Sequence, residues 1–314
     1  MRSSTLFSIA ILAFLMLVVS YRVNAQQLPS QRGYLNQGIL WNPALTAPGS
    51  TWETGACYQQ QWIQFPGAPS TLYVYGQVPF VELNMSAGLV AFMDEAGPFL
   101  QAGGQASYAY KIAPGFFWKD QLSIGISGKA SRMRFDANRV VAYDEGDDLL
   151  SEDLSGEWGF DFGAGIFYTS HNTFDFDQNT WYTGISVDQL DQTVYRLGTD
   201  HRVYGNRMHW RALAGYRFIK YYHCWEPSIY ADMVGGGLFN VGGGVRYERD
   251  RRFWVSVGGE LEGLARFGLG WIFSPIQFGS SNILIGAEAD YGLSSLARYQ
   301  GLSYQFTMAW RGLR

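Results

Sequence analysis

The sequence predicts an all-β protein, a single transmembrane antiparallel β-barrel of about fourteen strands. Three observations lead to this prediction: a repeated two-residue alternation, an unusual composition and an N-terminal export signal. The alternation is clearest near the C-terminus, where apolar residues occupy every second position from Ile283 to Tyr291 and again from Leu302 to Trp310. A period of two gives a strand one apolar and one polar face, and aromatic residues near the strand ends are typical of strands that cross an outer membrane.

The composition fits a barrel wall whose residues face lipid and lumen alternately. Aromatic residues make up 17% of the chain and charged residues only 16%, whereas soluble domains average about 25% charged residues. There are 38 glycines in 314 residues, well above the average of about 7%. The net charge of −4 argues against nucleic acid as a partner. A soluble β-sandwich is the alternative fold, but it would expose more charge and carry fewer Trp and Tyr residues.

Residues 1–25 have the features of a secretory signal peptide. Arg2 supplies the positive start, Leu6–Val19 the apolar core, and Val23–Ala25 a cleavage site before Gln26. The core is shorter than the ~20 residues of a transmembrane helix, and no later stretch approaches that length. Because only helices and closed barrels satisfy their backbone inside a membrane, we expect a barrel located in the outer membrane, with its lipid as one partner.

The mature chain divides into an N-terminal segment and the barrel. Residues 26–50 lack strand alternation and are expected to fold into the lumen as a partial plug, and residues 51–314 form the barrel. Two long polar breaks, 136–157 and 189–206, fall on the external side if the first strand rises from the periplasm, and external loops of such barrels are long. The predicted strands begin near Trp52, Ser70, Leu83, Pro98, Leu122, Trp158, Tyr182, Arg207, Trp225, Phe239, Phe253, Arg266, Asn282 and Leu302.

The predicted inward face carries charges of both signs. Such charges can pair across neighbouring strands and fill the interior, or they can line a wet channel; we favour ion pairs. They are Lys129, Asp161, Asp188, Arg211, Arg217, Glu226, Asp232, Arg246, Glu248, Glu260, Arg266, Glu288 and Asp290.

Searches for catalytic and metal-binding patterns give no enzyme prediction. The chain lacks the G-x-S-x-G, Walker and H-E-x-x-H motifs, so we expect neither catalysis nor a cofactor. The acidic run 144–153 could hold calcium, but it lacks the spacing of a dedicated calcium loop and is better explained as a solvated surface. The four histidines have no ligand spacing. A disulfide between Cys57 and Cys224 is chemically possible in an exported chain, but two unpaired thiols are expected.

The order of short motifs resembles a known family. The chain has Tyr34-x-Asn36, Asn42-Pro43-Ala44, Tyr58-x-x-Gln61-Trp62, Pro69–Thr71, Gly88-Leu89 followed by Asp94 and Gly97, Leu122–Ser127, Phe162–Tyr168, Tyr182–Ser186, Gly215-Tyr216 and Glu226–Ser228. This order and spacing is similar to that of the PorP/SprF family of outer-membrane proteins of Bacteroidetes, over essentially the whole mature chain. The chain departs from it near the end, where Ser303 stands without a neighbouring histidine and Arg311–Arg314 follows the last aromatic residue.

The resemblance implies a non-enzymatic barrel of the type IX secretion or gliding machinery. Its partners would be other components of that machinery or a cell-surface adhesin, for which the barrel acts as a scaffold or docking site. An outer-membrane channel or porin for small solutes is the alternative. The candidate partner-binding residues, in the external loops 137–157 and 189–206, are Asp144, Glu145, Asp147, Asp148, Arg196, Asp200 and Arg202; the candidate lumen and N-terminal motif is Tyr34, Asn36, Asn42, Pro43, Gln61 and Trp62.

Overall fold

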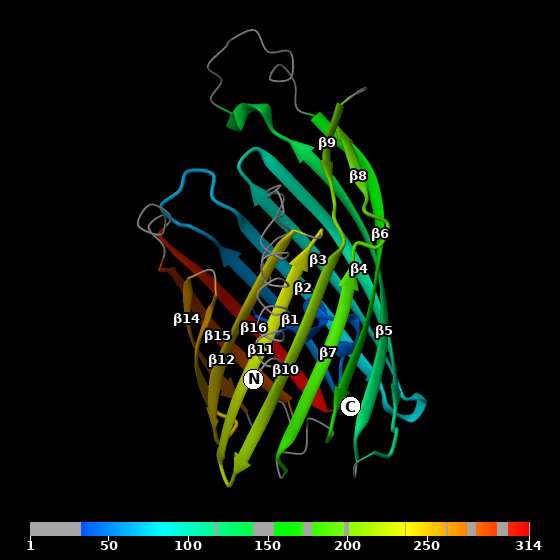
Figure 1. Ribbon diagram of the computed structural model, residues 1–314, viewed down its shortest axis with the longest axis vertical. Coiled ribbons are helices and arrows are strands. Elements are labelled where there is room, and N and C mark those ends of the chain that lie inside the picture. The colour runs from blue at the N-terminus through cyan, green and yellow to red at the C-terminus, as the bar shows by residue number, and fades with distance from the viewer. Residues whose placement is uncertain are drawn as a thin grey trace, which may run out of the picture.

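The chain forms a closed antiparallel barrel of fourteen strands, in which β1 closes against β16 (Figure 1). The computed structural model describes residues 33–116, 119–140, 154–171, 178–197, 201–235, 237–261, 263–274, 281–293 and 301–313. The predicted fold class and strand number are therefore confirmed. In the described part of the chain, no helix has the length and apolar character needed to cross a membrane.

Each predicted strand corresponds to one strand of the wall. The largest difference in a starting point is at β6, which begins at Leu154 rather than at Trp158. The barrel strands are β1 (Thr51–Gln60), β2 (Ser70–Phe80), β3 (Met85–Ala96), β4 (Phe99–Ile112), β5 (Gln121–Phe135), β6 (Leu154–Thr169), β7 (Thr180–Asp188), β10 (His209–Lys220), β11 (His223–Val234), β12 (Leu238–Arg249), β13 (Phe253–Glu260), β14 (Leu264–Phe273), β15 (Ser281–Gly292) and β16 (Leu302–Leu313).

The two-residue alternation decides which side chains face the lumen. On β5, Ser123 and Ser131 are buried inside, whereas Ile124 and Ile126 are 44% and 59% exposed on the outer face. The outer face of a barrel can remain apolar because lipid covers it. The wall therefore carries its polar residues inward, as the alternation predicts.

The end of the barrel that holds both strand termini, Thr51 and Leu313, carries aromatic side chains on its outer face. Trp52 and Trp310 lie with ring centroids 4.9 Å apart across the β1–β16 pair. Such rings are enriched where a membrane meets water. We call this end the terminal end, and the other end, which carries both long polar breaks, the loop end.

The polar break 189–206 contains regular structure that the sequence did not predict. A two-stranded hairpin, β8 (Val194–Leu197) and β9 (His201–Gly205), packs against β5 and β6 at the loop end (Figure 1). Tyr195 is buried, its hydroxyl lies 2.5 Å from Ser131 Oγ, and Gln101 donates a hydrogen bond of 3.1 Å to it. Strands of four and five residues are too short for alternation to reveal, and for this reason the break was expected to be irregular.

The N-terminal segment, residues 33–50, contains two single turns of helix: α2 (Gly38–Trp41) and η1 (Pro43–Leu45). Its apolar side chains are buried against inward-facing residues of the wall in two clusters. Two further short helices lie in connections: η2 (Val81–Leu83) between β2 and β3, and η3 (Ala137–Arg139) after β5. We call residues 33–50 the lumen segment.

Candidate functional site

The turn at Asn42 ties the lumen segment to the wall. Its side-chain oxygen accepts a hydrogen bond of 2.8 Å from the Ala44 N–H, which caps η1, and Pro43 takes the first helical position. The side-chain nitrogen donates to the carbonyl oxygens of Ile166 at 3.1 Å and Ile185 at 3.2 Å. One asparagine thus both shapes the turn and joins it to β6 and β7.

Glycines on the wall make room for this turn. A Cβ added at Gly125 would overlap the backbone between Pro43 and Ala44, and one at Gly165 would overlap the Asn42 side chain. Inward glycines permit a close approach between two backbones that any other residue would block. The wall strands β5 and β6 are therefore shaped to receive the lumen segment.

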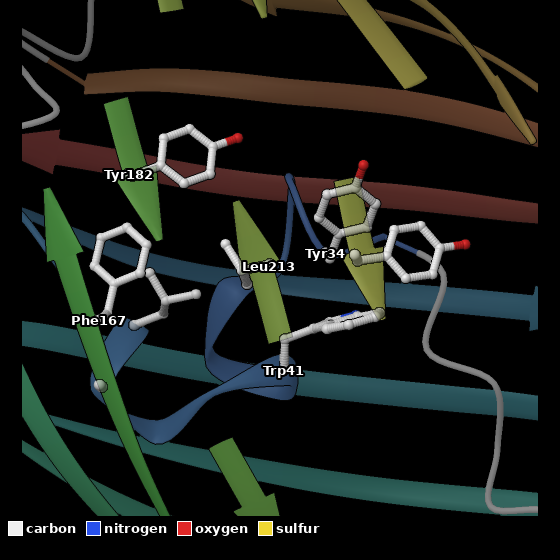
Figure 2. Packing of buried hydrophobic residues seen from close by; sticks show 8 residues of the cluster. Tyr34, Trp41, Phe167, Tyr182 and Leu213 are labelled. Atoms are coloured by element: carbon white, nitrogen blue, oxygen red, sulfur yellow. The ribbon is translucent and has the colours of Figure 1, made fainter. Parts of the chain in front are cut away.

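Aromatic side chains anchor the start of the lumen segment (Figure 2). The rings of Tyr34, Trp41 and Tyr230 lie 4.8 to 5.4 Å apart between centroids. The Tyr34 hydroxyl lies 2.7 Å from Ser228 Oγ, and burial raises the pKa of this hydroxyl, so it remains protonated. The rest of this cluster consists of Ala44, Leu45, Phe167, Tyr182 and Leu213.

Polar side chains hold the same region from the other side of the lumen. Asn36 donates to Glu288 Oε1 at 2.8 Å and accepts from Arg246 Nη1 at 2.9 Å. Gln37 donates to Thr307 Oγ1 at 2.7 Å. These hydrogen bonds give the buried side-chain amides of Asn36 and Gln37 partners on the wall, which lowers the cost of burying them.

The end of the lumen segment is held through its backbone carbonyls. Lys111 Nζ donates to the carbonyl oxygens of Ala47 and Gly49 at 2.5 and 3.2 Å, and Ser86 donates to that of Thr46. Among the described residues, the segment is hydrogen-bonded to eleven of the fourteen strands: β2 (Gln77), β3 (Ser86), β4 (Lys111), β5 (Gln121), β6 (Ile166), β7 (Ile185), β10 (Arg211), β11 (Ser228), β12 (Arg246), β15 (Glu288) and β16 (Thr307).

Ion pairs occupy the inward faces beside the segment. Arg266 contacts Glu260 Oε1 at 2.9 Å and Asp290 Oδ1 at 2.8 Å, and Arg211 contacts Asp188 Oδ2 at 2.7 Å. Five of the predicted inward charges thus pair across neighbouring strands: Asp188, Arg211, Glu260, Arg266 and Asp290. Two cavities adjoin the segment, with volumes of only about 40 and 50 Å³.

A larger groove, of about 460 Å³, lies at the loop end. Ile63 and Phe65, 49% and 57% exposed, project from the β1–β2 connection on its border. The other wall has an ion pair, in which Arg139 Nη1 lies 2.9 Å from Glu95 Oε2. We call it the rim groove; its lining residues are Gln60, Ile63, Phe65, Gly67, Ala68, Ser70, Glu95, Gly97, Arg139 and Tyr304.

The structure brings together only some of the predicted lumen and N-terminal motif. Tyr34, Asn36, Asn42 and Pro43 lie together in the lumen segment. Gln61 and Trp62 instead form the connection after β1 at the loop end. There the Gln61 N–H donates to Pro69 O at 2.8 Å, and the Trp62 N–H to Ser303 Oγ at 3.1 Å.

The predicted partner-binding residues are described only in part. Arg196 and Arg202 are cross-strand neighbours in the β8–β9 hairpin. Asp144, Glu145, Asp147, Asp148 and Asp200 lie outside the described residues.

Several residues of the site have no local sequence signal. Gln37 and Gly165 were not predicted, and Gln37 finds its partner Thr307 270 residues away. Within the described ranges, no group of His, Cys, Asp and Glu is placed to hold a metal ion, and the acidic run 144–153 lies outside them. Cys57 and Cys224 are separate, buried thiols.

A closed antiparallel barrel with an apolar outer wall, aromatic ends and a polar interior defines an outer-membrane protein. The chain is similar to solved structures that include a Pseudomonas aeruginosa FadL homologue (10% identity, TM-score 0.47, covering 87% of this chain and 92% of that one) and the CymD monoaromatic hydrocarbon channel (10% identity, TM-score 0.49, covering 88% of this chain and 92% of that one). The Pseudomonas putida toluene transporter TodX is also similar (7% identity, TM-score 0.45, covering 88% of this chain and 92% of that one).

No curated protein matches the sequence significantly. The family described as type IX secretion system membrane protein PorP/SprF matches residues 23–310, and the chain belongs to that family. The predicted family and location in the outer membrane are thereby confirmed. The family consists of secretion-system membrane proteins and is not one of enzymes.

Proposed function

We propose that this barrel is a non-enzymatic, non-conducting scaffold of the type IX secretion or gliding machinery. Membership of the PorP/SprF family supports a role in secretion together with other secretion components. In this proposal the loop end faces the cell exterior and docks a secreted surface protein or another component of the machinery.

The observation that carries the proposal is the filled lumen. The lumen segment is hydrogen-bonded to most of the wall, from Gln77 on β2 to Thr307 on β16. A small-solute channel needs a continuous wet path, whereas here a backbone segment and buried ion pairs such as Arg266–Asp290 occupy the interior. We therefore favour the plugged barrel over the alternative of a channel.

The rim groove is the proposed docking site, together with the loops 137–157 and 189–206. Its volume of about 460 Å³ falls within the roughly 300–1,000 Å³ of ligand pockets. Ile63 and Phe65 offer apolar surface to a side chain of the partner, and Arg139 and Glu95 offer polar groups to its backbone. This combination suits a short extended segment of a protein.

A pull-down from detergent-solubilised outer membranes tests both parts of the proposal. The tagged barrel is expected to recover type IX components or one large surface protein, and the variant Ile63→Ser/Phe65→Ser to recover much less. The matched control is Val81→Ser/Leu83→Ser, because these residues are apolar side chains of comparable exposure, both 59% exposed, at the terminal end. Equal recovery by all three proteins would rule out the rim groove as the docking site.

Conductance in a planar bilayer tests the closed lumen separately. The purified barrel is expected to give no steady current steps. Steady steps, together with recovery of the barrel alone in the pull-down, would establish a channel and refute the scaffold.

A further inference from the structure

A row of basic side chains lies on the outer face of the wall at the terminal end. Lys220 pairs in register with His223 across β10–β11, and His223 pairs with Arg249 across β11–β12. All three are exposed. Since neighbouring strands lie about 4.8 Å apart, the row spans roughly 10 Å. Arg251 and Arg252, both exposed, follow in the next turn. We call these five residues the basic row.

An aromatic row lies directly beside it on the same outer face, two residues closer to the middle of each strand. Phe218 pairs with Trp225, and Trp225 with Tyr247, and the rings of the second pair are 4.7 Å apart. Two residues of strand are about 7 Å, so the rows lie at different depths on the same face. Phe218 and Trp225 are 50% and 52% exposed. A hydrogen bond of 2.6 Å between His223 Nδ1 and Tyr247 Oη joins the rows.

The positions of the two rows indicate the depth in the membrane at which a bound molecule would lie. Aromatic side chains at strand ends lie at the level of lipid headgroups, with the hydrocarbon on one side and water on the other. The basic row, one step closer to water on the same outer face, therefore lies where headgroup phosphates are found. Lys220 and Arg249 point out of the barrel, so an occupant approaches from the membrane and not from the lumen.

The charge of this sector is strongly one-sided. The β12–β13 turn contains one acidic residue, Asp250, whose Oδ2 lies 3.5 Å from Arg249 Nε. The basic row has three arginines here: Arg249, Arg251 and Arg252. Other described turns at the terminal end, not adjacent to β10–β13, differ: Val81–Leu83 between β2 and β3 contains Glu82 and no basic residue, and Lys119 between β4 and β5 is followed by Asp120. Compared with these described turns, the basic residues are concentrated at β10–β13.

We propose that the basic row binds the phosphodiester headgroup of an anionic phospholipid in the leaflet at the terminal end. Lys220 and Arg249 donate to the phosphate oxygens, and the aromatic row packs on the glycerol and the first acyl carbons. Charge-assisted bonds from Arg and Lys to phosphate are strong and directional. The inference is independent of the docking role of the loop end.

Lipid retention by the purified full-length barrel tests the proposal. The barrel in a nonionic detergent is titrated with phosphatidylglycerol or phosphatidylcholine, and bound lipid is counted by native mass spectrometry. We expect tighter binding of phosphatidylglycerol, and a dissociation constant for it that rises about a hundredfold in Lys220→Gln/Arg249→Gln/Arg252→Gln, since each of the three basic residues near a membrane contributes about fivefold.

Two further variants serve as controls. Arg132→Gln/Arg134→Gln removes two exposed, outward-facing arginines of β5 towards the loop end and should leave phosphatidylglycerol binding unchanged. The charge-conserving variant Lys220→Arg/Arg249→Lys should bind like the original protein. Heat-dependent migration in gel electrophoresis confirms that each variant folds.

The proposal is overturned if the triple glutamine variant retains phosphatidylglycerol as well as the original protein does. It is also overturned if soluble glycerol phosphate displaces the lipid at equal concentration, which would identify a site for free phosphate. Loss of a periplasmic protein in the pull-down, with unchanged lipid binding, would assign the basic row to a protein partner instead.

Discussion

The Asn42→Ala variant should release the lumen segment without unfolding the barrel. The substitution removes the cap of η1 and both bonds to the β6 and β7 carbonyls, three hydrogen bonds in all. At a net 0.5–1.5 kcal/mol each, the loss is roughly 2–4 kcal/mol. Since 1.4 kcal/mol is a factor of ten, the undocked fraction should rise about thirtyfold to several hundredfold.

Cys57 provides a natural reporter for this opening. It is 3% exposed and lies in the apolar cluster beneath Ile39 and Leu40 of the lumen segment. In a Cys224→Ser background it is the only thiol of the chain. Its rate of reaction with a hydrophilic maleimide should increase in proportion to the undocked fraction, while heat-dependent gel migration of the barrel stays the same.

The matched control is Asn138→Ala. Asn138 is an exposed asparagine whose hydrogen bonds within the described part of the chain are to nearby Asp136 at the loop end, so its loss should not change the labelling rate. A Cys57 rate that stays within about twofold of the original in Asn42→Ala would refute the reasoning, because three net hydrogen bonds would then contribute almost nothing.

Two further variants address the glycine wall and the buried charges. Gly165→Val places a Cβ where the lumen segment lies, so Cys57 labelling should rise in a folded barrel. Gly128→Val, at a position with open space around it, should leave the labelling rate unchanged. Equal labelling of the two variants would contradict the steric account. Arg266→Gln leaves the carboxylates of Glu260 and Asp290 without their cation and should lower the free energy of unfolding in urea by about 3–5 kcal/mol. Adding Asp290→Asn should restore part of that loss, and no recovery would argue against the pair.

The wall could be predicted from the sequence because its information is local. Alternation from Ile283 to Tyr291 assigns a face to each residue without knowledge of the neighbouring strands. The information for the turn at Asn42-Pro43-Ala44 is local too, because the cap and the proline act within three residues.

Features that depend on strand register could not be predicted in this way. Trp254 is 1% exposed inside the barrel, where it packs on the spaces left by Gly268, Gly270 and Gly286 of neighbouring strands. Alternation places Trp254 on the same inward face as Glu260, but only the strand register shows that glycines such as Gly270 leave the space for its ring. The partners of Asn36 and Gln37 could not be predicted, because they also depend on which strands lie close together.

The long reach of the lumen segment has a consequence for assembly. Gln37 and Asn36 are exported early in the order of the chain, yet their partners Thr307 and Glu288 belong to the last two strands, 270 and 252 residues later. Contacts of such sequence separation form late in folding, because the intervening chain must be ordered first. A barrel stalled before β15 and β16 lacks these two partners and holds Asn36 and Gln37 less tightly. Complete docking of the lumen segment therefore requires the last two strands to be in place.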